Sequence, residues 1–358
     1  MLKRIDTYII KKFIGTYIFS ITLILSISII FDINEKISNF LNPEVTLHEI
    51  VFDYYLNFIP YYMNMFSALF TFIAVIFFTS KLADNSEVIA MLAAGISFRR
   101  LMRPYMISAA LIAILSFILG SYIIPPSSIE RLAFLDKYID KNKTVYASSI
   151  QLAVEPGVIA YFDRYDVKVK RGYRFSLEKF EDKKLVSRVT ARRISYDSAY
   201  HWKLHNYTER RFEGMRERVR SGEMLDTTIH IVPSDFMISD SDSEQMSTPE
   251  LRRYINRQRE RGIGNITAFE LEYHKRFAMP MSAFILTIIG ASLSSRKIKG
   301  GMGLNIGIGL LLSFGYIFFM TISSTFAISG QMSPMFAVWL PNISYIFIAI
   351  YLYTKAPR

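Results

Sequence analysis

Residues 104–129 read PYMISAALIAILSFILGSYIIPPSSI and contain no charged side chain. A helix needs about 20 apolar residues to cross about 30 Å of hydrocarbon, so this stretch is long enough to span a membrane. Uncharged runs also occupy 13–31, 54–80, 277–295 and 300–354. The last run is too long for one helix, and the turn residues SGQMSP at 329–334 divide it. The sequence therefore predicts six transmembrane helices.

Basic residues indicate how these helices are oriented. Lysine and arginine lie before the first run, between the second and third, between the fourth and fifth, and after the last. The loop after the first run is acidic instead. Because lysine and arginine in short loops remain cytoplasmic, we expect both termini in the cytoplasm and a multi-pass protein of the inner membrane. The long segment after the third run then faces outward.

Composition excludes several classes of function. The chain has 358 residues, of which 51% are hydrophobic and 20% charged, and its net charge is +11. Many of the basic residues flank apolar runs, so a membrane protein is favoured over a nucleic-acid-binding one. There is no cysteine, no H-E-x-x-H and no G-x-x-x-x-G-K-[ST] loop. We therefore expect no metal site and no ATP bound by this chain itself. The spans contain almost no ionisable side chains, so we also expect no catalytic residues.

The middle of the chain differs from its two ends. Apolar and polar residues alternate at 158–162, 173–177, 202–204 and 229–231, with glycines between these segments. Such alternation predicts β-strands with one face on a hydrophobic interior. The pattern fits an all-β, jellyroll-like domain, whose interior is either a closed core or an open groove for an acyl chain. A short helix is predicted after it, with Ser247 or Thr248 as its cap. The predicted division is 1–125, 126–265 and 266–358.

A short amphipathic helix is predicted in the loop at about 84–97. Asn85 or Ser86 can cap it, Glu87 lies in its first turn, and Gly95 is a plausible stop. Its apolar face comprises Val88, Met91 and Leu92. That face either lies on the membrane surface or docks into a groove on a soluble partner.

Further candidate sites are charged residues near the outer ends of the spans. Lys275 and Arg276 interrupt the orientation pattern there, and a charge so close to hydrocarbon is a functional candidate. The others are Asp32, Glu35, Lys36, Arg131 and Lys137. Lys36 can either contact a lipid phosphate or pair with Asp32. Separately, the G-x-x-x-G spacing of Gly303 and Gly307 favours close helix packing.

Several motifs together resemble one family. They are IDTYI at 5–9, SEVIAMLAAGIS at 86–97 followed by Arg100-Leu101 and Pro104, MSTPEL at 246–251, EYHKRFAMP at 272–280, and AVWLPN at 337–342 after Pro334. The chain resembles the LptF/LptG (YjgP/YjgQ) permeases of lipopolysaccharide export, nearly from end to end. The stretch DINEK at 32–36 leans toward the LptG-like member.

The resemblance implies six membrane helices and a periplasmic jellyroll. It implies that the permease pairs with a second six-span permease of the family and is driven by a dimeric cytoplasmic P-loop ATPase, which uses ATP and Mg²⁺. Lipopolysaccharide would enter from the outer leaflet and pass to a periplasmic jellyroll bridge. Residues 84–97 would form the coupling helix, with Glu87 as the acidic contact. The coupling set is Glu87, Val88, Met91, Leu92, Gly95 and Arg99; the substrate set is Asp32, Glu35, Lys36, Arg131, Lys137, Lys275 and Arg276.

Two alternatives remain open. The chain could be a membrane-anchored envelope scaffold that does not transport, in which case it has no need of an ATPase-docking segment. It could also be a permease for another envelope lipid or for a lipoprotein, which the lipid in the purified complex would distinguish.

Overall fold

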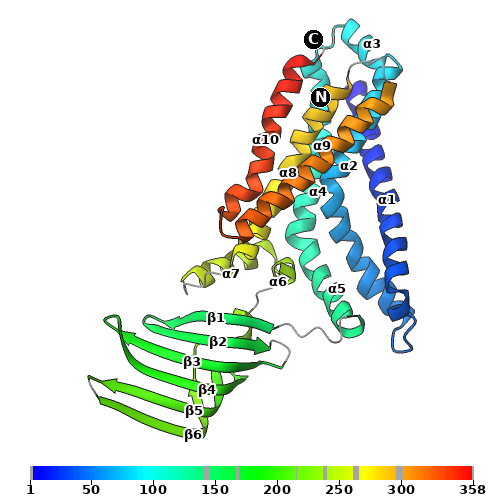
Figure 1. Ribbon diagram of the computed structural model, residues 1–358. Helices are drawn as coiled ribbons and strands as arrows, with labels where there is room; N and C mark the ends of the chain where they lie inside the picture. The colour runs from blue at the N-terminus through cyan, green and yellow to red at the C-terminus, as the bar shows by residue number, and fades with distance from the viewer. Residues whose placement is uncertain are drawn as a thin grey trace. The chain divides into compact units, whose positions relative to one another are not determined.

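The computed structural model describes residues 3–139, 146–166, 169–214, 216–236, 240–260, 266–295 and 301–356 (Figure 1). The chain divides into two compact units. One, the helical unit, contains the long helices, in residues 1–139, 244–248 and 270–358. The other contains the β-sheet and two short helices, in residues 140–243 and 249–269.

Three continuous helical segments form the first half of the helical unit. The first is α1 (Arg4–Phe40). The second begins with the π-helical segment η1 (Glu49–Tyr55) and continues as α2 (Leu56–Asp84). The third joins α4 (Phe98–Ile118), the π-helical η2 (Leu119–Ile123) and α5 (Ile124–Tyr138). This helical segment passes the predicted domain boundary at 125, because Pro125 and Pro126 lie in the first turn of α5, where proline is tolerated.

Three further helices complete the unit. They are α8 (Thr267–Ser294), α9 (Gly301–Ile328) and α10 (Pro334–Lys355). The break between α9 and α10 is where the turn residues predict it, with Gly330 at φ +77°. In all, six helical segments of the described chain are long and apolar enough to cross a membrane, which confirms the predicted spans.

The helical unit has an apolar interior and an apolar exterior. Its largest buried cluster joins α1, α2 and α4 through residues such as Phe13, Phe78 and Tyr105. Large apolar side chains also point outward, and examples are Phe19, Leu311 and Phe347, each more than two-thirds exposed. A water-soluble surface would not carry so many, whereas lipid tails solvate them readily.

The second unit is built on one six-stranded antiparallel sheet. Its strands are β1 (Tyr146–Glu155), β2 (Val158–Asp166), β3 (Arg171–Glu181), β4 (Lys184–Ser198), β5 (His201–Glu213) and β6 (Arg216–Thr228). They pair in sequence order, as a meander (Figure 1). The inserted β domain is therefore confirmed, and the strands of the described chain form a single sheet.

Residues of the chain that follows β6 pack on the apolar face of the sheet. The apolar face of the sheet carries three large aromatic residues that are at most 1% exposed, namely Trp202, Phe162 and Phe175. The Phe236 ring stacks on Tyr165 with centroids 3.8 Å apart, and it belongs to the short 3₁₀ helix η3 (Pro233–Phe236). The predicted strand at 229–231 is wrong, because these residues are an irregular cover over the core. Their alternation reflects burial alone.

Two short helices connect the sheet back to the helical unit. They are α6 (Asp240–Glu244) and α7 (Thr248–Glu260). The predicted helix at 247 corresponds to α7, in which Leu251 and Ile255 are buried and Tyr254 contacts Phe269. Glu244 itself belongs to the helical unit.

Candidate functional site

A seven-residue helix, α3 (Glu87–Ala93), lies between α2 and α4 at the end of the bundle that holds both chain termini (Figure 1). Ser86 precedes it in the left-handed region, with φ +62°. Gly95 follows it at φ +81°, a conformation that glycine adopts without a steric penalty. The predicted helix and its glycine stop are both present.

The apolar face of α3 packs inside its own chain. Val88 is fully buried, and Met91 and Leu92 pack against the cluster formed by α1, α2 and α4. The described chain itself therefore covers much of this face, most fully at Val88. The reason is the shortness of the loop, which folds α3 back onto the ends of the neighbouring helices. Ile89, Ala90 and Ala93 form the exposed face instead.

Glu87 is held from two sides at the start of α3. The Tyr8 hydroxyl donates to Glu87 Oε2 at 3.1 Å, and Asn85 Nδ2 donates to Glu87 Oε1 at 3.3 Å. Arg99, the other charged member of the predicted coupling set, is exposed at the start of α4. Tyr8 lies 79 residues from Glu87 along the chain, so no local sequence pattern predicts this contact.

A second contact ties α1 to the start of α4. Both terminal nitrogens of Arg100 donate to the carboxylate of Asp6, at 2.7 and 2.6 Å. Asp6 is buried, and Ser97 caps α4 by accepting from the Arg100 backbone N–H. Two-pronged pairing of this kind fixes both distance and orientation.

At the other end of the bundle, Asp32 of α1 is a buried carboxylate with several donors. The Tyr54 and Tyr55 hydroxyls donate to it at 3.1 and 3.0 Å, and Lys36 forms an ion pair with it. Of the two alternatives for Lys36, this structure contains the pairing with Asp32. Glu35 lies between them in sequence and is exposed.

Arg131 of α5 is in a buried polar cluster with Tyr61 of α2 and Glu244. The guanidinium lies over the Tyr61 ring, 4.6 Å from its centroid, and 3.6 Å from a Glu244 oxygen. The Tyr61 hydroxyl donates to the other Glu244 oxygen at 3.1 Å. Burial, and then the nearby negative charge of Glu272, raise the pKa of Glu244 above its ordinary value.

Arg131 is not fully satisfied there. Its Nε is buried and has no hydrogen-bond partner within the described residues. Because a buried donor without a partner is costly, binding of a further acceptor at this Nε would be favourable.

Arg276 is buried on α8 and forms an ion pair with Glu272. Its Nε donates to Glu272 at 3.0 Å, and one terminal nitrogen donates to the Thr248 hydroxyl at 3.1 Å. Lys275 is half-buried, and its charge acts on the Glu244 carboxyl. The structure therefore brings Arg131, Lys275 and Arg276 into one polar region around Glu244 and Glu272.

Lys137 lies apart from that cluster, on the exposed side of α5. It pairs with Glu49 at 3.1 Å, and the Tyr138 hydroxyl donates to the same carboxylate oxygen at 2.7 Å. An aromatic cluster that includes Tyr54, Phe58 and Phe134 fills the space near this pair. The predicted substrate residues thus form separate groups, each already containing an acidic partner.

Among the described residues, no helix packs closely on the predicted glycine motif. A Cβ added to Gly303 or Gly307 would meet nothing within 4 Å. The close approaches are elsewhere: a Cβ on Gly309 would collide with Ile76, and one on Gly290 would lie 2.9 Å from Val75. The G-x-x-x-G spacing predicts a helix surface that another helix can approach closely, but it does not identify that helix.

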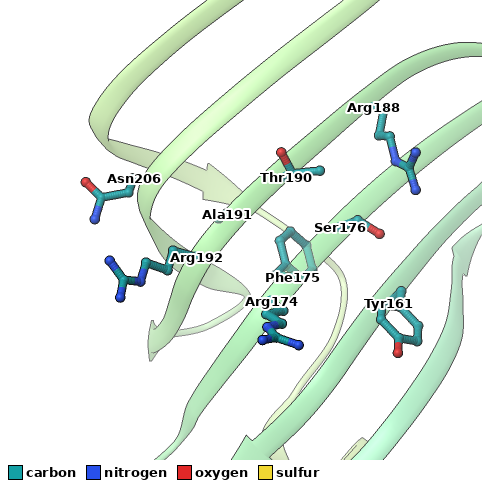
Figure 2. Close-up of a pocket in the computed structure, with 9 residues that line it drawn as sticks. All are labelled: Tyr161, Arg174, Phe175, Ser176, Arg188, Thr190, Ala191, Arg192 and Asn206. Carbon is teal, nitrogen blue, oxygen red and sulfur yellow. The ribbon is translucent and has the colours of Figure 1, made fainter.

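The outer face of the sheet carries an open basic hollow of about 400 Å³. Figure 2 shows its lining residues: Tyr161, Arg174, Phe175, Ser176, Arg188, Thr190, Ala191, Arg192 and Asn206. Arg188 pairs with Glu178 at 2.8 Å, and Arg174 lies 3.8 Å from Asp163. Acidic neighbours thus partly neutralise its charge.

Comparison with known proteins identifies the family. No individual characterised protein matches the chain. Residues 7–355, however, match the family described as lipopolysaccharide export system permease LptF/LptG. The match covers all six membrane helices, the inserted sheet and α3. The chain therefore belongs to the LptF/LptG family of lipopolysaccharide export permeases.

Proposed function

We propose that this chain is a permease subunit of an ATP-driven exporter that extracts lipopolysaccharide from the outer leaflet of the inner membrane. The sheet domain would lie in the periplasm and pass the lipid to a bridge of similar domains, and both termini would be cytoplasmic. The observation that carries the proposal is the family match over residues 7–355, which includes the membrane helices and the sheet together.

ATP would be hydrolysed by a partner. The chain has no phosphate-binding loop of its own, so we assign ATP and Mg²⁺ to a cytoplasmic P-loop ATPase dimer. The docking element is α3. Val88, Met91 and Leu92 hold it from inside, while Glu87, Arg99 and the small residues up to Gly95 face outward. A carboxylate at such a position suits an arginine on the ATPase.

The lipid phosphates would bind at the outer cations. Arg131 and Arg276 have acidic partners already, so an incoming phosphate would compete with Glu244 and Glu272 for them. Lys275 lies beside the same carboxylates. Lys36 and Lys137 are similarly paired, with Asp32 and Glu49. Exchange of one anion for another would let the site bind and release lipid at modest cost.

A second six-span permease would complete the lipid path. In the apolar 18-residue stretches of α1 and α9 that could cross the membrane, only 22% of the residues are buried within this chain. Gly303 and Gly307 lie in α9 with open space over them. We propose that they allow close approach of a helix from the second permease.

The proposal is tested by affinity purification of the chain from its native membrane in mild detergent. Wild type should retain a P-loop ATPase and a second six-span permease, and Glu87→Arg should lose the ATPase alone. Glu130→Arg reverses an exposed charge on α5 and serves as the control. If wild type retains no ATPase, the chain is a scaffold. If an ATPase is present but the co-purified lipid is another envelope lipid or a lipoprotein, the substrate assignment fails.

A further inference from the structure

The coupling acid is not positioned by its own helix. α3 has seven residues, barely two turns, and Ser86 at its start makes no side-chain cap. So short a helix restrains a terminal side chain weakly. Both oxygens of Glu87 nevertheless have donors, Tyr8 on one and Asn85 on the other. Tyr8 belongs to α1, the first membrane helix.

That helix contacts the loop at both of its ends. Tyr8 of α1 reaches Glu87 where α3 begins, and Asp6 of α1 binds Arg100 where α4 begins. Between these points Val88 is buried against the cluster that contains Ile9 and Phe13 of α1. Displacement of α3 therefore acts directly on the N-terminal turns of α1.

We infer that Tyr8 is a positioning residue for coupling: its hydroxyl orients the Glu87 carboxylate toward the ATPase and links movement of α3 to α1. The inference rests on the proposed function, in which Glu87 contacts the ATPase. A lone hydrogen bond between exposed groups adds little to stability, and the Tyr8 side chain is 41% exposed. Its effect should therefore appear in coupling rather than in folding.

A displacement of α1 at Tyr8 could reach the opposite end of the helical bundle. α1 is one continuous helix from Arg4 to Phe40 and has few of its residues buried within the chain. Near its far end, Asp32 is bound to Tyr54 and Tyr55. A shift of α1 at Tyr8 would change this contact, since an unbroken helix transmits displacement along its axis.

The test compares Tyr8→Phe with Tyr17→Phe. Tyr17 lies in the same helix, and its hydroxyl shares a hydrogen bond with Ser67 at 2.8 Å, remote from α3. The complex purified with its ATPase is reconstituted in vesicles containing lipopolysaccharide, and the lipid released per ATP hydrolysed is measured. Tyr8→Phe should lower this ratio about 3- to 10-fold, the range of one hydrogen bond, without changing Tm. Tyr17→Phe should preserve the ratio.

Glu87→Gln separates the inference from the proposed function. If Tyr8 acts through Glu87, the double variant Tyr8→Phe/Glu87→Gln should release no less lipid per ATP than Glu87→Gln alone. Additive losses, or a Tyr8→Phe ratio equal to wild type while Glu87→Gln is impaired, would overturn the role of Tyr8 only. If Glu87→Gln itself has the wild-type ratio, the coupling assignment and this inference both fail.

Discussion

Asp6 of α1 accepts both terminal nitrogens of Arg100 of α4, at 2.7 and 2.6 Å, at the end of the bundle where α3 lies. The carboxylate side chain is 4% exposed and the guanidinium 25% exposed. The Lys3 backbone N–H also donates to Asp6, at 2.8 Å. The start of the first membrane helix is thus fixed to the third span by a charged pair that water only partly reaches.

Loss of this pair should destabilise the helical unit. Asp6→Asn and Arg100→Gln each leave one charged group without its partner, so each should lower Tm measured in detergent. The double variant should lose less than the sum of the two, because no unpaired charge remains in it. Equal and additive losses would show that the two side chains do not depend on each other.

A larger residue at Gly309 should destabilise the helical unit. Its missing side chain makes room for Ile76 of α2, which is 1% exposed, so Gly309→Ala should cost about 1–3 kcal/mol through overpacking. Gly303→Ala is the matched control in the same helix, since nothing lies within 4 Å of its added Cβ. Thermal unfolding of the single chain measures both, and equal stability of the two variants would contradict the packing.

Gly303→Ala should instead weaken pairing with the second permease. The amount of second permease that co-purifies should fall, while the Tm of the isolated chain stays at the wild-type value. Unchanged pairing would remove Gly303 from the proposed contact between permeases.

The Glu244 carboxyl should make stability depend on pH. Its pKa is raised, mainly by burial and then by Glu272, so the folded state holds its proton more tightly than the unfolded state does. The resulting stability is complete below the unfolded pKa, about 4.5, and is lost as pH rises through the higher folded value. Glu244→Gln, which resembles the protonated form, should lose that part of the dependence.

Tm measured against pH for wild type and Glu244→Gln gives the test. The difference between the two curves matters, because other carboxyl groups titrate in both proteins. Parallel curves would show that Glu244 keeps an ordinary pKa in the folded chain.

Trp202→Phe should weaken the sheet domain. The indole Nε1 donates to the Ile231 carbonyl at 3.1 Å and is fully buried, so the substitution leaves that oxygen unpaired and costs about 1–3 kcal/mol. This loss of stability is measured by unfolding the full chain in denaturant and monitoring protease cleavage within β1–β6. Wild-type resistance to cleavage would mean that the segment after β6 does not depend on this bond.

The six membrane helices can be predicted from the amino-acid sequence because a lipid bilayer places simple requirements on length and polarity. A run of about 20 uncharged, apolar residues is long enough to form a helix that crosses the bilayer. Such runs predict the spans, and the turn residues before Pro334 predict the break between the last two. Alternation identified the strands for the same reason, a single buried face. It failed at Ile229 and Ile231, which are buried without strand pairing.

The site was less accessible to sequence analysis. Glu87 and Arg131 could be named from their position, but their partners Tyr8 and Glu244 lie far away in the chain, and only the folded structure brings them together. The burial of Val88 was missed for a related reason. An amphipathic pattern shows which face is apolar, and not what covers it.

The most direct test of the proposed function is ATP-dependent removal of lipid from vesicles that contain the purified complex, lipopolysaccharide and phospholipid together. We expect that lipopolysaccharide leaves the membrane only when ATP is hydrolysed, that phospholipid stays, and that Glu87→Arg abolishes the transfer. Release of a different lipid, or ATP hydrolysis without loss of lipopolysaccharide from the vesicles, would contradict it.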